Sequence, residues 1–178
     1  KTNDWKKLLL NLADFWNKKP QEATQYATKL TEGIRKSEQI QFISEAKEYT
    51  NADIKAIFDP WKRSFDTAEG GYNRAPKFPL PNNWQFMLRY AHLMKDDAAH
   101  ISTRLTLQKM AFGGIYDHIG GGFARYSVDD KWHIPHFEKM LYDNAQLVSL
   151  YAEAYQHTPH DLYKQVVYQT LDFIKREL

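Results

Sequence analysis

Cysteine is absent from the 178 residues of this sequence, and glycine and proline are sparse, with eight and seven residues. The lack of cysteine excludes disulfides, thiolate chemistry and cysteine-based zinc sites from this segment. It is compatible with a reducing compartment, and we expect a cytoplasmic protein.

Long apolar runs and a strong excess of one charge are also missing. No stretch approaches the roughly 18–20 apolar residues of a membrane span, and no basic and apolar signal peptide opens the chain. With 24 basic and 22 acidic residues the net charge is +2, so charge gives no argument for nucleic acid or an anionic membrane as a partner. We expect neither.

The sequence does contain enough apolar material for one folded core, because 43% of its residues are hydrophobic and 15% are aromatic. The chain begins at Lys1 without an initiating Met and ends at Leu178 within a helical pattern. We therefore expect a piece of a longer protein.

Apolar residues recur with a helical period along most of the chain. The stripe from Trp5 to Trp16 predicts an amphipathic helix with one buried face. Thr50 or Asn51 is the expected N-cap of a later helix, and residues 39–49 predict only a short helix or loop. Helices are predicted over 5–16, 20–34, 54–65, 84–98, 101–112, 138–157 and 161–178.

Two long segments break this period. Residues 66–81 contain two glycines and three prolines and predict an ordered loop. Gly120-Gly121-Gly122 interrupts the second segment, where residues 123–128 and 131–134 predict a small β-hairpin around Asp129-Asp130. The prediction is an all-α chain whose long loops are the place to seek a site.

Residues 113–144 concentrate polar and ionisable side chains beside the three glycines, a density that a helix bundle does not need. Asn144 lies at the centre of the apolar face of the helix predicted over 138–157. A buried asparagine must find partners for its amide. It either ties down the glycine segment or points into a polar cleft, and both interpretations stay open.

His118, His133 and His136 are residue types that bind metals. Pro135 lies between two of them and their spacing is not helical, so the geometry of helical zinc motifs is absent and we expect no metal. The sequence also lacks the fingerprints of a nucleophile elbow, a P-loop and a Rossmann fold, and we expect no cofactor.

Two carboxylates of a glycosidase could come from Asp117 or Glu138 paired with Asp143. Helix capping and ion pairs with Arg125 and Lys139 explain the same residues, and we favour this structural explanation.

His118 and His136 have the chemistry of general acid–base groups near neutral pH, although a hydrogen-bonded loop histidine is an equal alternative. Lys77 lies in the Ala-Pro-Lys-Phe-Pro segment 75–79 and could reach a cleft. The usual alternative is a lysine at the surface of a loop that its prolines make rigid.

Three motifs together resemble a known family. They are GGYNRAPKFP over 70–79, GGIYDHIGGGFARYSVD over 113–129 and PHFEKMLYDNAQL over 135–147. Their order and spacing closely resemble the thioredoxin-domain proteins related to spermatogenesis-associated thioredoxin-like protein, strongly over residues 50–178 and more weakly over 1–37. The departures are Tyr72-Asn73 in place of Phe-Gly, and Ala124 where histidine is common.

The resemblance implies a large protein in which a thioredoxin-like domain precedes an (α/α)6 toroid similar to N-acylglucosamine 2-epimerases and six-hairpin glycosidases. Residues 1–37 would be a helical linker after the missing thioredoxin-like domain, and residues 38–178 the first portion of the toroid. That domain and the remaining half of the barrel would be its partners. Helix faces meant for the missing half would be exposed, so we expect self-association.

In such toroids the cleft forms from loops at one end of the barrel, and a sugar-like substrate is expected there by analogy of fold. Candidate acid–base residues are Asp117, His118, His136, Glu138 and Asp143. Candidate substrate-binding residues are Lys77, Tyr116, Arg125, Tyr126, Trp132 and Asn144. The alternative is a non-catalytic module that binds a partner or supports the thioredoxin-like domain.

Overall fold

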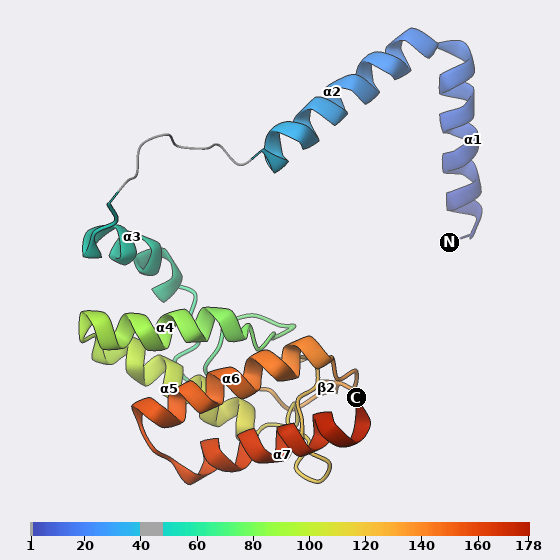
Figure 1. The fold of residues 1–178 in the computed structure, drawn as a ribbon. Coiled ribbons are helices and arrows are strands. Elements are labelled where there is room, and N and C mark those ends of the chain that lie inside the picture. Colours follow the sequence, from blue (N-terminus) through green and yellow to red (C-terminus); the bar gives the residue numbers. More distant parts are fainter. Residues whose placement is uncertain (1, 40–47) are drawn as a thin grey trace. The chain divides into compact units, whose positions relative to one another are not determined.

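The computed structural model describes residues 2–39 and 48–178, and the chain divides into two compact units, residues 1–48 and 49–178. The described residues form seven helices and one two-stranded sheet (Figure 1). The predicted all-α class is therefore confirmed. Within the described part of the chain, no helix is both long and apolar enough to cross a lipid bilayer.

The first unit consists of α1 (Thr2–Lys18) and α2 (Pro20–Glu38). Pro20 occupies the first turn of α2, where its missing N–H costs no hydrogen bond. The helix predicted over 5–16 is therefore present. Its apolar side chains from Trp5 to Trp16, however, keep 39–63% of their surface exposed, so that its apolar face is not buried within this unit. The weaker helix or loop predicted over 39–49 falls mostly on residues outside the described ranges.

The second unit begins with α3 (Asn51–Lys62), whose N-terminus is a capping box. The Thr50 hydroxyl accepts from the Asp53 N–H at 3.4 Å, and the Asp53 carboxylate accepts from the Thr50 N–H at 2.9 Å. These bonds satisfy backbone groups that the first turn leaves without a helical partner. Phe58 anchors the helix to the body, with its ring centroid 4.1 Å from that of Tyr90.

Four helices form the body of this unit: α4 (Pro81–Met94), α5 (Asp97–Phe112), α6 (Leu141–His157) and α7 (Asp161–Glu177). α4 packs against α5 and α6, and α6 packs against α7, so that two helical hairpins lie side by side (Figure 1). Trp84, Met110, Leu147 and Tyr151 are buried among them. The Tyr151 hydroxyl donates to the Leu107 carbonyl at 2.7 Å, which satisfies a polar group in the core.

The break between α4 and α5 comes earlier than the apolar stripe predicts. Lys95 ends α4 in the left-handed conformation, with φ 52°. The Asp96 side chain then accepts from the Ala99 N–H at 3.0 Å and starts α5. The helix predicted over 84–98 is therefore divided, because Asp96 caps a new helix within its apolar stripe.

The small sheet joins β1 (Tyr126–Ser127) to β2 (Pro135–His136) in an antiparallel pair, with Tyr126 opposite His136. A hairpin is thus present, but its second strand begins later than predicted. The Asp129 carboxylate accepts from three N–H groups at 2.6–3.2 Å, those of Lys131, His133 and Ile134. These bonds hold 129–134 as a compact loop instead of a strand.

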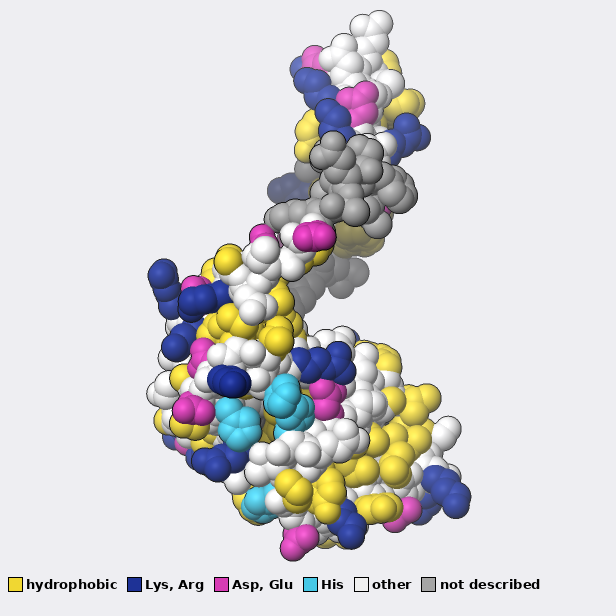
Figure 2. Space-filling model, turned by 60° about the vertical axis from the view of Figure 1, so that its left-hand side comes forward, with side chains coloured by type: hydrophobic (Ala, Val, Ile, Leu, Met, Phe, Trp, Pro, Cys, Tyr) yellow, Lys and Arg dark blue, Asp and Glu magenta, His cyan; other side chains and the backbone are white. Residues whose placement is uncertain are grey.

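The surface of the helical body is uneven in polarity. In Figure 2 apolar side chains gather over one side of this body, beside an area that mixes basic, acidic and histidine side chains. Phe112, Tyr168 and Leu178 are among its exposed apolar side chains. The described surface therefore offers apolar area for contact with other protein surfaces.

Two glycines allow the loop 113–124 to approach α7. Gly121 and Gly122 have φ of +75° and +82°, the left-handed region that side chains disfavour. A Cβ on Gly121 would overlap the backbone carbonyl of Gln169, and one on Gly122 would lie 2.5 Å from the Phe173 ring. Only glycine fits this approach without a shift of backbone.

Replacement of Gly121 by alanine is therefore expected to lower the free energy of unfolding by about 2 kcal/mol or more, from backbone strain and overlap with α7. The matched control is Gly33→Ala, because a Cβ there meets no atom within 4 Å. Urea denaturation followed by circular dichroism measures both. Equal stability of the two variants would contradict the close approach.

Candidate functional site

Asn144, on the first turns of α6, is fully engaged with the glycine segment. Its Oδ1 accepts from the Phe123 N–H at 2.7 Å. Its Nδ2 donates to the Phe123 carbonyl at 3.1 Å and to the Met140 carbonyl at 2.9 Å. Of the two interpretations left open by the sequence, the structure places Asn144 as the tie between α6 and the loop.

Asp117 organises the turn that contains the three glycines. Its Oδ1 accepts from the N–H groups of Ile119 and Gly120 at 3.0 and 2.8 Å, and its Oδ2 accepts from Lys139 Nζ at 2.8 Å. The Lys139 ammonium, followed by these N–H groups, lowers the pKa of Asp117 to about 2. Its carboxylate is accordingly an ionised structural group at neutral pH.

Lys139 completes this corner of the loop. Its Nζ also donates to the Gly121 carbonyl at 2.8 Å and lies 4.4 Å from the centroid of the Phe173 ring. One ammonium thus joins Asp117, the glycine turn and α7.

Tyr116 is buried beneath the same loop. Its hydroxyl donates to Gln169 Oε1 at 2.6 Å, and its ring packs edge-on against His118 and at a tilt against Phe123. Burial raises the pKa of Tyr116 to about 12. The phenol is therefore neutral and hydrogen-bonded within the protein.

Lys77 is buried, contrary to the surface position that is usual for lysine. Its Nζ donates to Asp66 Oδ2 at 2.8 Å and to the Gly70 carbonyl at 2.7 Å, and lies 5.3 Å from the centroid of the Trp132 ring. Burial works to raise the pKa of Asp66, but the Glu69 N–H and the Lys77 ammonium bring it below its ordinary value. Lys77 and Asp66 form an ionised, largely buried pair.

Trp132 closes the wall over Lys77 and is fully buried. Its Nε1 donates to the Glu69 carbonyl at 2.9 Å, which joins the two long loops. Its backbone has φ 65°, and Gly71 and Gly113 allow it to fit closely. Trp132 therefore supports the loops and does not offer a free ring face.

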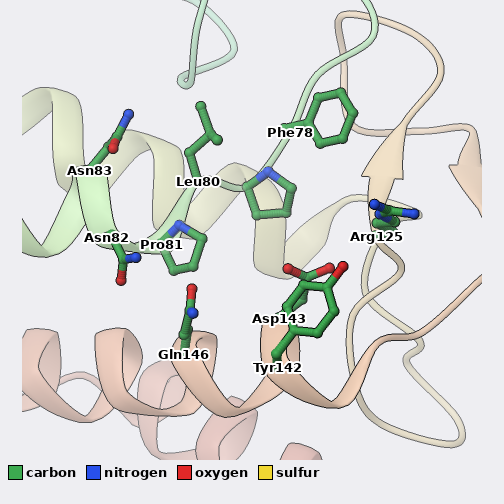
Figure 3. Close-up of a pocket in the computed structure, with 10 residues that line it drawn as sticks. Phe78, Leu80, Pro81, Asn82, Asn83, Arg125, Tyr142, Asp143 and Gln146 are labelled. Carbon is green, nitrogen blue, oxygen red and sulfur yellow. The ribbon is translucent and has the colours of Figure 1, made fainter. Parts of the chain in front are cut away.

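Arg125 and Asp143 meet instead at an open cleft of about 290 Å³, together with Tyr142, which was not singled out from the sequence (Figure 3). The cleft lies between the end of the 66–81 loop, the start of α4, the residue before β1, and α6. We name it the Arg125 cleft. It is lined by Phe78, Pro79, Leu80, Pro81, Asn82, Asn83, Arg125, Tyr142, Asp143 and Gln146.

The charged groups at this cleft are loosely held. Arg125 NH1 donates to Glu138 Oε2 at 3.3 Å, and both side chains are more than 40% exposed. Among the described residues none donates a hydrogen bond to the Asp143 carboxylate. Burial, aided by Glu138 and opposed by Arg125, raises the pKa of Asp143 above its usual range. The surroundings of Asp143 thus favour its protonated form more than water does.

Tyr126 and His136 lie next to the cleft in a short stack of rings. The centroid of Tyr126 is 4.7 Å from that of Phe78, and 4.6 Å from that of His136 with the two planes 18° apart. Phe78 also lines the Arg125 cleft. His136 is exposed at the outer end of this stack.

A second hollow of about 380 Å³ is lined by two other candidate residues, Asp117 and His118. Lys139 and the highly exposed Phe137 also line it. His118 Nε2 lies 3.2 Å from the Gly113 carbonyl, a contact that fits the alternative of a hydrogen-bonded loop histidine. The sequence-predicted residues therefore divide between a buried framework, this hollow and the Arg125 cleft.

Several cleft residues were not singled out from the sequence. Asn82 and Asn83 open α4 after Pro81, and Tyr142 and Gln146 flank the turn of α6 that contains Asp143. A helical wheel places Gln146 beside Asp143, a signal that was present. Asn82 and Asn83 gave none, because their position depends on how the 66–81 loop folds.

Metal-ligating side chains are not gathered in the described residues, where no group of three or more histidine, cysteine, aspartate or glutamate residues could hold an ion. No family model matches the sequence.

Three relatives share substantial similarity with the chain. An uncharacterised protein of Caenorhabditis elegans is 41% identical over 69% of this chain and 18% of its own length. Human spermatogenesis-associated protein 20 is 42% identical over 68% of this chain and 16% of its own, and the rat protein of that name is 33% identical over 96% and 22%. The chain thus spans about a fifth or less of these curated relatives, and the similarity agrees with the family expected from the motifs.

Asn144→Ala should lower the free energy of unfolding by about 3 kcal/mol, because it leaves buried groups of Phe123 and Met140 without partners. Gln146→Ala on the same helix is the control and should change stability by less than about 0.5 kcal/mol. Urea denaturation of the two variants checks this. A similar small effect of both would argue against the tie between α6 and the loop.

The contribution of Asp117 to stability should depend on pH. Its folded pKa of about 2 lies below its ordinary value of 3.8, so its stabilisation is complete above the unfolded pKa and is lost as pH falls through the folded one. Asp117→Asn should therefore lower the thermal midpoint at pH 7, and the gap to the unchanged protein should narrow between pH 5 and pH 2. A gap that is constant across this range would contradict the ionised pair with Lys139.

Proposed function

We propose that this chain is a segment of a protein of the spermatogenesis-associated protein 20 family, and that its helical body contributes to a carbohydrate-active domain. The Arg125 cleft would take the sugar-like substrate. One observation supports this most: an open cleft combines exposed aromatic rings, side-chain amides and a carboxyl group with a raised pKa.

The lining of the cleft suits a polyhydroxylated ligand. Tyr142 is half exposed and Phe78 more than a third exposed, so both offer ring faces to the apolar C–H faces of a sugar. The amides of Asn82 and Gln146 provide both donors and acceptors for hydroxyl groups. Polar and apolar surface share the wall of the cleft about equally, so that the hydroxyl groups and the C–H faces of one ligand would both find partners.

Asp143 is the proposed general acid, because burial raises its pKa and a general acid must carry a proton before it can donate it. Glu138, held beside the cleft by Arg125, is the proposed second carboxylate of a glycosidase- or isomerase-like pair. His136, at the exposed end of the ring stack, is a further proposed proton carrier.

The proposed setting is the one that the motifs imply. Residues 1–37 would be the helical linker after a thioredoxin-like domain, and residues 38–178 would begin an (α/α)6 toroid completed by the rest of the protein. The division of the chain near residue 48 and the two adjacent helical hairpins of α4–α7 support this organisation. The apolar side chains exposed on that body support its proposed contacts with the rest of the barrel or with a second copy.

A non-catalytic binding or supporting module is the second candidate, and a specific observation favours it. Lys77, Tyr116, Asp117, Trp132 and Asn144 are engaged with other groups of the protein and build a framework. Beside them Ile119 and Phe137 are 100% and 86% exposed, as at a surface that contacts another protein.

Saturation-transfer NMR with neutral mono- and disaccharides on the 178-residue chain separates the two candidates. We expect binding with a dissociation constant on the order of 1 mM, weakened at least fivefold by Asp143→Ala or Tyr142→Ala. The controls are Asp172→Ala and Tyr168→Ala, which change exposed residues of the same types on α7. No transfer from any saccharide would remove the carbohydrate proposal and favour the second candidate.

A further inference from the structure

The charge distribution of the Arg125 cleft points to a narrower class of ligand. Arg125 is the one cationic side chain on its described lining, and a single bond of 3.3 Å to Glu138 engages its guanidinium. The remaining N–H groups bond to no side chain of the described residues. A guanidinium has five donors in a planar fork, so an open edge remains for a ligand.

The backbone fixes where this open edge lies. The Arg125 N–H donates to the Glu138 carbonyl at 2.8 Å, directly before β1. Figure 3 shows Arg125 at one end of the cleft, with Tyr142 and Asp143 beside it and Asn82 and Gln146 toward the other end. The cleft therefore has a cationic end and an end suited to hydroxyl groups.

The neighbours of Arg125 limit the charge that a ligand can bring. The Glu138 carboxyl group pairs with the guanidinium, and Asp143 lies on the same side of the cleft. A phosphate dianion would be repelled by both carboxyl groups and would have one guanidinium to oppose it. A single carboxylate matches the planar fork in shape and carries one charge only.

We propose that the Arg125 cleft is selective for acidic carbohydrates, sugars of the uronate class whose carboxylate binds the open edge of Arg125. This inference rests on the proposed carbohydrate function and specifies its substrate class. In this arrangement the ligand carboxylate receives parallel hydrogen bonds from the guanidinium, and its hydroxyl groups extend toward Asn82 and Gln146.

Titration of the 178-residue chain with glucuronate, glucose and glucose 6-phosphate, followed by NMR, tests this selectivity. Glucuronate should bind at least tenfold more tightly than glucose, and glucose 6-phosphate should bind more weakly than glucuronate. Arg125→Gln should abolish the preference, so that this variant binds glucuronate no more tightly than glucose. Arg125→Lys keeps the charge without the planar fork and should retain only part of it.

Arg63→Gln is the matched control, because Arg63 is exposed at the end of α3 and should leave all three affinities unchanged. Equal binding of glucuronate and glucose would overturn the inference and leave the carbohydrate function in place. Tighter binding of glucose 6-phosphate would overturn the preference for a carboxylate. No binding of any of the three would overturn the inference together with the function on which it rests.

Discussion

The buried ammonium group of Lys77 is the constraint on which the arrangement of the loops depends. It holds Asp66 and the Gly70 carbonyl on one side and faces the Trp132 ring on the other. The Lys77 backbone also exchanges two hydrogen bonds of 2.8 Å with Ser127. A buried charge is strongly destabilising without its partners. The 66–81 loop and the hairpin loop must therefore fold together around the Lys77 ammonium group.

This constraint positions the cleft as well as the loops. Phe78 directly follows Lys77, and Arg125 lies two residues before Ser127, so both sides of the Arg125 cleft adjoin the same pairing. The groups that build the framework are ionised or hydrogen-bonded inside the protein. Those at the cleft, Arg125 and Asp143, are held loosely and stay accessible to a ligand. The hydrogen bonds and ion pairs of the framework thus hold Arg125 and Asp143 in a defined place, although these two side chains are themselves weakly bonded.

Helical periodicity predicted the helices, and in α4–α7 the apolar stripe is indeed buried. The same periodicity placed Asn144 on the apolar face of α6, where the structure buries it. It missed the break at Lys95 and Asp96, since a local cap competes with the stripe. The sequence pattern also predicted the second strand of the hairpin too early in the chain, because the Asp129 carboxylate accepts hydrogen bonds from backbone N–H groups there and holds them in a loop. The burial of Lys77 could not be predicted, because Trp132 lies far away in the sequence and only the folded loops bring the two together.

Asp143 and Asn144 show why residues 113–144 mix framework and candidate chemistry so densely. Consecutive residues of a helix point roughly 100° apart, so this turn of α6 directs Asn144 to the glycine segment and Asp143 to the cleft. The three hydrogen bonds of Asn144 fix the rotation and height of that turn. Asp143 can then remain without a bonded partner and still keep its position opposite Arg125. A protonatable carboxyl group needs this independence, because a hydrogen bond from a cation would hold it ionised.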